Sequence, residues 1–304
     1  MEVKDRYRRF GEWKQRSHQV APLSDEAHEC ATCGTHYEGN YCPRCGQSAR
    51  IGRYSFKKAL LLFLDVWGVG NRGMFRSIRD LILRPGYMIR DYLQGMQMAY
   101  FPPFKMLFLL CTLSFLIDSG LNIQGINRYK LYMEQEKEYA EQKKAEAQND
   151  KTLSEVRRTT AIAAQDVIYL TEEKIKENYQ FVMLFSLLVF SLPLWMLLRH
   201  SPAIPDLRLS ECFVSMVYIT NMLLIYSLIP SLLCFSFKAE YRFDLLVLLL
   251  AVIPIKQLSG YSYWNTIWRL LLALIPFVFI LFLSYLAAVL YIVLTEHPEI
   301  LLQE

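Results

Sequence analysis

The strongest constraint on how this chain folds is an uninterrupted apolar segment near its C-terminus. Leu270–Leu294 contains no charged side chain along its whole length. A helix needs about 20 mostly apolar residues to cross the hydrocarbon core of a bilayer. The segment exceeds that length and therefore predicts a membrane-spanning helix.

The overall composition agrees with that prediction. Of the 304 residues, 53% are hydrophobic and only 20% are charged. A soluble domain is usually about 45–50% apolar and about 25% charged. The composition also excludes a disordered chain, which lacks apolar residues, and a small disulfide-rich scaffold, which is far shorter.

Four further apolar blocks are candidates for spanning. Cys212–Phe237 is uncharged and comfortably long, and Phe181–Leu198 is uncharged and just long enough. Met106–Ile117 is too short by itself, and becomes long enough if its flanking residues lie at the two membrane interfaces. Leu245–Ile255 is shorter still, and could extend through residues 260–264 with an aromatic belt. We expect five spans. If Leu245–Ile255 is instead a re-entrant or interfacial helix, the number of spans is four.

The excess positive charge lies entirely in the N-terminal third. Residues 1–105 carry 17 basic and 10 acidic side chains, whereas the rest of the chain carries 16 and 19. Basic segments of membrane proteins stay on the cytoplasmic side. Taken together with the apolar blocks, this charge distribution indicates a cytosolic N-terminus rather than a nucleic-acid-binding surface. With five spans, the tail at 295–304, which has three Glu and no Lys or Arg, lies outside.

A long polar stretch, from Asp118 to Gln180, separates the first two predicted spans. Arg128–Gln148 is dense in Glu, Lys, Gln and Ala, which are strong helix formers. Apolar residues then recur at a 3/4 spacing from Leu153 to Leu170, after a natural turn at Asn149–Asp150. We expect a helical hairpin on the extracytoplasmic side, either a merely solvated pair of helices or a docking arm for a protein partner.

Four cysteines supply the sharpest chemical signal. Cys30 and Cys33 form one Cys-x2-Cys-Gly motif, and Cys42 and Cys45 form a second. Four thiolates suit tetrahedral Zn²⁺ and leave no coordination position for water, which is typical of a structural site. We therefore expect these residues to bind Zn²⁺, with folding of the small module coupled to metal binding.

Disulfides are the alternative for this cluster. They would need an oxidising compartment, whereas the charge distribution places the segment in the cytosol. The other cysteines, Cys111, Cys212 and Cys234, lie in apolar blocks and are interpreted as small core residues. With four thiols present, neither His28 nor His36 is needed as a ligand.

Each Cys-x2-Cys-Gly motif forms a tight turn that we call a knuckle. A series of short motifs follows the second knuckle, Cys42-Pro-Arg-Cys45-Gly46-Gln47. They are Asn71-Arg72-Gly73, Asp80-Leu-Ile-Leu-Arg84-Pro85-Gly86, Asp91-Tyr92-Leu93-Gln94-Gly95 and Tyr100-Phe-Pro102. The series resembles the bacterial domain-of-unknown-function family 3667, and the knuckles look like the zinc ribbons that bacteria attach to membrane proteins. The resemblance covers roughly residues 30–110 and implies a bacterial inner-membrane architecture, not a mechanism. The family commonly has Gly-Lys-Arg where this chain has Gly95-Met96-Gln97, which puts any role of those basic residues in doubt.

Two short helices are predicted between the ribbon and the first span. An apolar stripe at i, i+1, i+4, i+7 and i+8 defines the first, with Arg76, Arg79 and Asp80 on its other face. The stripe comprises Met74, Phe75, Ile78, Leu81 and Ile82. Arg84-Pro85-Gly86 ends this helix and opens the next. The pair could lie in the membrane interface or pack on the transmembrane bundle.

The first 29 residues are charged and contain no apolar segment of the kind that opens a signal peptide. Aromatic residues among the basic ones could make a weak interfacial anchor, but we favour a disordered basic tail. Nucleic acid is not expected as a partner. The basic residues Arg44, Arg50 and Arg53 of the ribbon have no aromatic stacking platform beside them.

The predicted fold class is therefore an all-α integral membrane protein, a helical transmembrane bundle with a small N-terminal zinc ribbon. The expected organisation, in chain order, is a basic tail (1–29), the zinc ribbon (30–50), amphipathic helices (51–104), a first span (105–125), the extracytoplasmic hairpin (126–180), and spans at 181–198, 212–237, 245–264 and 270–294.

Three functions fit this organisation. The favoured one is an adaptor, scaffold or regulatory protein of the bacterial inner membrane, whose ribbon binds a cytosolic protein partner. The second is a channel or transporter for a small or lipid-like solute, in which Pro193, Pro230, Pro254 and Pro276 kink the helices. The third is a membrane enzyme, for which no catalytic residues stand out. An oligomer is compatible with all three.

Overall fold

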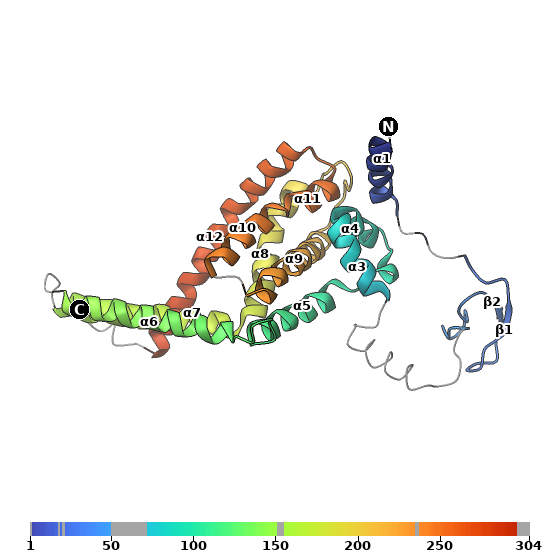
Figure 1. Ribbon diagram of the computed structural model, residues 1–304. Helices are drawn as coiled ribbons and strands as arrows, with labels where there is room; N and C mark the ends of the chain where they lie inside the picture. The colour runs from blue at the N-terminus through green and yellow to red at the C-terminus, as the bar shows by residue number, and fades with distance from the viewer. Residues whose placement is uncertain are drawn as a thin grey trace.

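The computed structural model describes residues 2–17, 19, 22–49, 72–150, 155–234 and 237–296. Almost all regular structure in this part of the chain is helical (Figure 1). The elements are α1 (Glu2–Gln15), β1 (Ala27–Glu29), β2 (His36–Glu38), α3 (Arg72–Leu83), α4 (Pro85–Leu93), the 3-10 turn η1 (Gln97–Ala99), α5 (Pro103–Asp118), α6 (Arg128–Asn149), α7 (Glu155–Glu177), α8 (Tyr179–Leu198), α9 (Leu209–Leu232), α10 (Phe237–Leu249), α11 (Val252–Ser259) and α12 (Tyr263–Glu296).

Within the described residues, four helical segments are long and apolar enough to cross a membrane. They are Gln97–Asp118, Tyr179–Leu198, Leu209–Leu232 and Tyr263–Thr295. The chain thus has the helices of a membrane protein, as its apolar blocks predicted. The block predicted as a further span at 245–264 is instead divided between α10 and α11, with a break at Leu250 and Ala251.

The long helices form a bundle with two distinct ends. At one end lie α3 and α4, which we call the cap; at the other end the α6–α7 hairpin leaves the bundle (Figure 1). Ile123, just before the hairpin, donates its N–H to the carbonyl of Leu232, so α9 ends at the hairpin end. Ala203 donates to the carbonyl of Ser259, and the Tyr261 hydroxyl donates to the carbonyl of His200, so α11 ends and α12 begins at the cap end.

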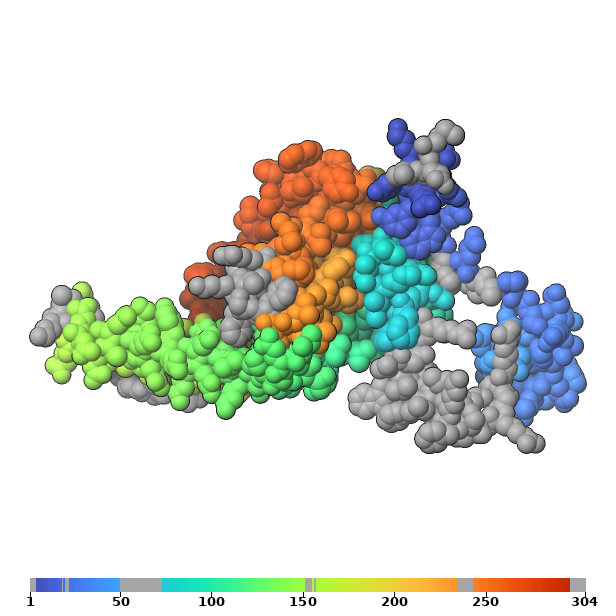
Figure 2. Space-filling view, in the orientation of Figure 1, coloured from blue at the N-terminus to red at the C-terminus, as the bar shows by residue number. Residues whose placement is uncertain are grey.

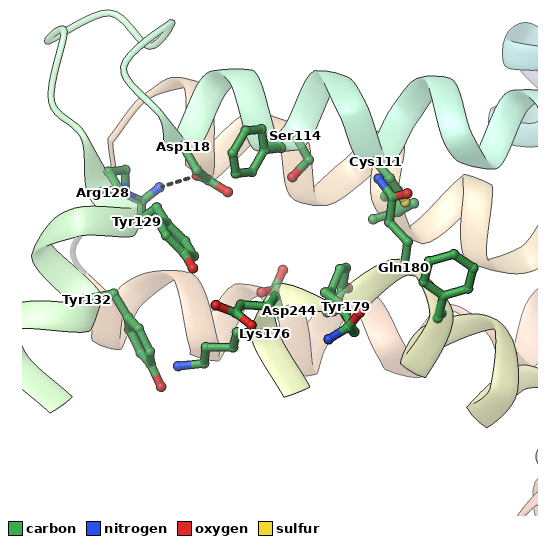
Figure 3. A pocket seen from close by; sticks show the side chains of 15 residues that line it. Cys111, Ser114, Asp118, Arg128, Tyr129, Tyr132, Lys176, Tyr179, Gln180 and Asp244 are labelled. Atoms are coloured by element: carbon green, nitrogen blue, oxygen red, sulfur yellow. Dashed lines mark ion pairs between the residues drawn. The ribbon is translucent and has the colours of Figure 1, made fainter. Parts of the chain in front are cut away.

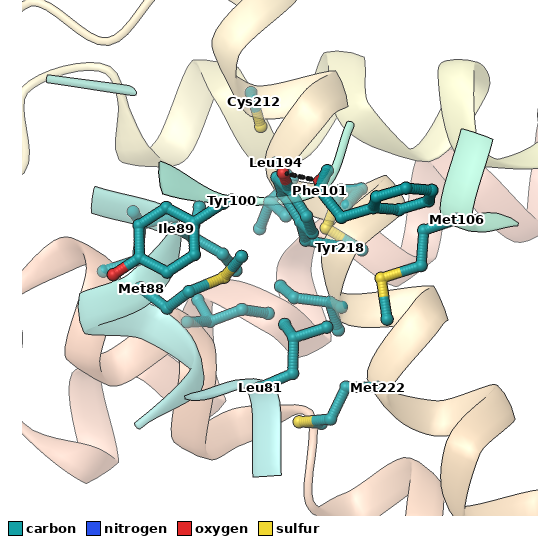
Figure 4. Close-up of a cluster of buried hydrophobic side chains, with 14 of the residues drawn as sticks. Leu81, Met88, Ile89, Tyr100, Phe101, Met106, Leu194, Cys212, Tyr218 and Met222 are labelled. Carbon is teal, nitrogen blue, oxygen red and sulfur yellow. Dashed lines mark hydrogen bonds between the residues drawn. The ribbon is translucent and has the colours of Figure 1, made fainter. Parts of the chain in front are cut away.

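The core lies where the cap meets α5, α8, α9 and α11 (Figure 4). Leu81, Met88 and Ile89 of the cap are completely buried there. The hydroxyl of Tyr218, also buried, donates a 2.7 Å hydrogen bond to the carbonyl of Phe101. This bond satisfies a carbonyl just before α5 in an apolar environment, where an unpaired one would be costly.

Of the two placements left open for the cap helices, the structure shows packing on the bundle. The predicted apolar stripe of α3 is divided: Met74 and Leu81 face the core, whereas Phe75 is 64% exposed and Ile82 is 41% exposed. Asp80, predicted on the polar face, is buried instead. Residues 51–71, the first part of the amphipathic segment predicted at 51–104, lie outside the described residues.

The α6–α7 hairpin extends away from the bundle as a long arm (Figure 2). Asn127 caps α6, because its side chain accepts a hydrogen bond from the N–H of Lys130. Lys144 of α6 pairs with Asp166 of α7, and Val167 is buried in the hairpin. The two helices predicted for this stretch are therefore present and packed on each other.

The favoured prediction of a disordered N-terminal tail is wrong for its first part, because Glu2–Gln15 forms α1. Its last turn is held by the cap: Arg84 donates to the carbonyl of Lys14 at 3.0 Å and also to that of Arg16. Arg79 lies over the ring of Trp13 at 5.8 Å. These partners are distant from α1 along the chain, so local sequence could not reveal them.

Candidate functional site

The four predicted metal ligands converge in the structure. The sulfur atoms of Cys30, Cys33, Cys42 and Cys45 all lie within 4.8 Å of one another. β1 pairs with β2 in antiparallel register and positions the first knuckle between them. The candidate cluster contains only cysteines among the described residues, so neither nearby histidine joins it.

Both knuckles have the same backbone geometry, which explains the spacing of the motif. The N–H of Gly34 donates to the carbonyl of Cys30, and the N–H of Gly46 donates to that of Cys42. Gly34 has φ +69° and Gly46 has φ +75°. Glycine adopts this left-handed conformation without steric cost, so a side chain at either position would strain the knuckle.

The sulfur geometry fits a tetrahedral metal ion. Cys30 and Cys45 Sγ are 3.4 Å apart, and Cys33 and Cys42 Sγ are 3.6 Å apart. Four sulfurs at about 2.3 Å from zinc would be about 3.8 Å from each other, whereas a disulfide needs about 2.0 Å. The hydroxyl of Thr35 lies 3.2 Å from Cys33 Sγ, within hydrogen-bond distance of this ligand atom.

A second polar cluster is buried in the cap and centres on Arg84. Its guanidinium pairs with Asp91, lies 3.5 Å from Asp80 and donates to the hydroxyl of Tyr100 at 3.0 Å. The side chains of Arg84 and Asp80 are each only 3% exposed. Arg84 thus lies between two buried carboxylates, and together with Arg79, which lies 2.8 Å from Asp80, it balances their charge; unpaired, these carboxylates would be very costly to desolvate.

Pro85 and Gly86 complete the cap. Pro85 opens α4 at a position where its missing N–H costs no hydrogen bond. Gly86 packs directly on α11: a Cβ there would lie 2.3 Å from the carbonyl oxygen of Pro254. The N–H of Gly86 donates to the Gln257 side chain at 2.9 Å. The three consecutive residues of the Arg-Pro-Gly triplet therefore have three roles: Arg84 anchors the polar cluster, Pro85 begins α4, and Gly86 allows α4 to pack tightly on α11.

Replacing Gly86 with Ala should loosen the cap from α11. A Cβ at 2.3 Å from a backbone oxygen forces the helices apart, and overpacking of this kind usually costs about 1–3 kcal/mol. Thermal unfolding of the purified protein in detergent would show the loss. Gly11→Ala is the matched control, because nothing lies within 4 Å of a Cβ at that position. Equal stability of the two variants would contradict the close contact.

Other residues singled out in the sequence have structural roles. Asn221 donates its side-chain amide to the carbonyl of Pro103 at 3.0 Å and links α9 to α5. Cys111 and Cys212 are buried in the bundle, far in sequence from the four-cysteine cluster. Sequence reasoning missed the buried roles of Asp80, Asp91 and Tyr100, although all three belong to the motif series that it quoted.

The comparisons with known proteins agree with the motif series. The family described as "Protein of unknown function (DUF3667)" matches residues 71–115, and this confirms the resemblance. The matched segment contains the whole Arg84 cluster, the cap and most of α5. Neither the curated proteins nor the solved structures gave a match.

Proposed function

We propose that this protein is a membrane-anchored adaptor of the bacterial inner membrane. Its four cysteines bind a structural Zn²⁺ ion in the cytosol, and the folded ribbon binds a protein partner there. The observation that supports the proposal best is the convergence of four thiols into a closed site. Four sulfur ligands leave no position for water or substrate, so the site suits recognition rather than catalysis.

The connection between ribbon and bundle also supports this function. The basic N-terminal third carries α1, the ribbon and the cap, and its charge favours the cytoplasmic side. The ribbon lies to one side of the cap, away from the bundle (Figure 1). Arg84 binds the end of α1 and two acids of the cap at once. A partner bound at the ribbon would thus be tethered to a rigid membrane anchor.

Affinity capture tests the recruitment function. Full-length wild type and the Cys42→Ser variant would be used as bait in detergent, with co-purifying proteins quantified by mass spectrometry. We expect at least one partner to be depleted about tenfold or more with Cys42→Ser, because an unfolded ribbon loses its binding surface. The control is Cys234→Ser, the same substitution outside the cluster. Identical captured proteins for all three baits would overturn the adaptor function.

We further propose that α10 and α11 together make a fifth, broken crossing. α9 ends at the hairpin end and α12 begins at the cap end, so the chain between them returns from one end to the other. Residues 237–259 span about 34 Å as helix, close to the ~30 Å hydrocarbon thickness. Arg90 of the cap donates to the carbonyl of Leu258 and secures the far end of this crossing.

A reporter fused after Glu304 decides the number of crossings. With five, the C-terminus lies on the side opposite the N-terminus, so an alkaline phosphatase fusion should be active and a green fluorescent protein fusion dark. A fusion after Asp206, in the α8–α9 loop, serves as the cytosolic control. The reverse pattern at Glu304 would place both termini on one side and exclude the fifth crossing.

A further inference from the structure

A large cavity lies at the hairpin end of the bundle, where α6 and α7 join the membrane helices. Its volume is about 910 Å³. Asp118 and Cys111 of α5 lie along one wall, and Lys176, Asp244 and Tyr179 lie along the opposite wall (Figure 3). A cavity of this size is at the upper end of the range for small-molecule sites.

The depth of the cavity places it at a membrane interface. Cys111 lies two helical turns before Asp118, the last residue of α5, which corresponds to about 10 Å of helix. Leu224 lies just over two turns before the end of α9, or about 12 Å. The cavity therefore runs from the headgroup level of the proposed bilayer to well within the acyl-chain region.

Two of the charges in the cavity neutralise each other. Arg128 Nη1 lies 3.9 Å from Asp118 Oδ1 and also donates to the carbonyl of Ser231. This pair closes the junction between α5 and α6, and both of its members already have partners within the chain. The other charged residues that line the cavity are Lys176, Asp244 and Glu177, of which Glu177 is exposed, and a ligand would be recognised by these.

Lys176 is the cation that needs a partner. Its ammonium is buried, has no hydrogen-bond partner among the described residues, and lies 3.2 Å from the ring centroid of Tyr132. Burial lowers the pKa of Lys176, since the charged form is poorly solvated there. A buried ammonium that has no hydrogen-bond partner in the described part of the chain gains strongly from an anionic ligand.

Asp244 supplies an acid in the same cavity. Its carboxylate accepts a 2.8 Å hydrogen bond from the hydroxyl of Ser227 and remains exposed to the cavity. A purely anionic ligand would be repelled by this carboxylate, while a purely cationic one would be repelled by Lys176. A ligand with both charges satisfies both groups.

We propose that the cavity binds a phospholipid whose headgroup carries a phosphate and an ammonium group. Lys176 binds the phosphate, Asp244 binds the ammonium, and the upper acyl chains lie against apolar lining residues such as Leu224. Phe115 and Phe181, 56% and 73% exposed, open the cavity toward the lipid side of the bundle. The proposal does not depend on the function of the ribbon, which belongs to the opposite end of the protein.

Native mass spectrometry of the full-length protein with added short-chain lipids tests the proposal. Didecanoyl phosphatidylethanolamine carries both charges, and didecanoyl phosphatidylglycerol carries the phosphate alone. We expect the first to bind at least about tenfold more tightly, because it alone satisfies Asp244. Soluble phosphoethanolamine, which has no acyl chains, should compete only at far higher concentration.

Variants assign the two charges separately. Lys176→Gln should weaken both lipids about tenfold or more, and Lys176→Arg should retain binding. Asp244→Asn should weaken phosphatidylethanolamine and leave phosphatidylglycerol unchanged or tighter. Lys137→Gln and Asp206→Asn, exposed and away from the cavity, are the matched controls and should change nothing.

Three results would overturn the proposal. Equal or tighter binding of phosphatidylglycerol by the wild type would show that Asp244 does not select an ammonium. Equal competition by phosphoethanolamine would show that the ligand is a soluble molecule. Unchanged lipid binding by Asp244→Asn would also overturn the proposal. This measurement decides the matter even if Lys176→Gln does not fold, because Asp244 is exposed and its substitution should not disturb folding.

Discussion

The Arg84→Met variant should lose about 3–5 kcal/mol of stability, the largest effect we expect from a single substitution in the bundle. Removal of the guanidinium leaves Asp91, whose side chain is 8% exposed, without its ion-pair partner, and it removes one of the two arginines beside Asp80, which is 3% exposed. It also removes the donor that holds the carbonyls at the end of α1. Unfolding of the purified protein in detergent, followed by heat or by SDS titration, would measure the loss.

Arg79→Met is the matched control for this prediction. Arg79 lies on the same helix and pairs with the same acid, Asp80, at 2.8 Å, but its side chain is 55% exposed. Because the Arg79 guanidinium is largely in contact with solvent and Asp80 keeps Arg84 as a partner, this variant should lose only about 0–1 kcal/mol. A large loss from Arg79→Met, or none from Arg84→Met, would contradict the central position of Arg84.

The Cys42→Ser variant should unfold the ribbon and leave the bundle intact. In its described part the ribbon has two strands of three residues each, which bury too little surface to fold without metal. Structural zinc contributes about 10–16 kcal/mol in small peptides of this type, and most of it would be lost. Hydrogen exchange should become fast at the N–H groups of Gly34 and Gly46, which are hydrogen-bonded in the knuckles.

The bundle provides the internal reference for that experiment. Peptides from α5 and α9 should exchange at the same rate in both proteins, because their core lies elsewhere. Cys234→Ser, outside the cluster, should leave the ribbon protected. Fast exchange in the bundle as well would mean that the two parts fold as one unit.

The sequence predicted what depends on local pattern. Long apolar runs such as Leu270–Leu294 marked the membrane helices, since length and hydropathy alone decide whether a helix can span. The spacing of the four cysteines marked the candidate metal site, because two knuckles of fixed geometry bring their thiols together. Arg84-Pro85-Gly86 marked the boundary between two helices, since proline and glycine act on the local backbone.

The sequence could not predict what depends on distant partners. Asp80 falls on the polar side of a helical wheel, yet it is buried because Arg84 and Tyr100 close over it. The end of α1 is held because its last carbonyls meet Arg84, which belongs to a distant part of the chain. The cavity with Lys176 and Asp244 joins several helices, and no single segment of sequence contains its pattern.

The metal content of the full-length protein, purified without chelator, is the most direct test of the proposed zinc ribbon. Elemental analysis should find one zinc ion per chain in the wild type and none in Cys42→Ser, while Cys234→Ser should keep its zinc. A wild-type chain that contains no zinc, with the four ribbon cysteines joined as disulfides, would contradict both the structural zinc site and the cytosolic placement of the N-terminal third.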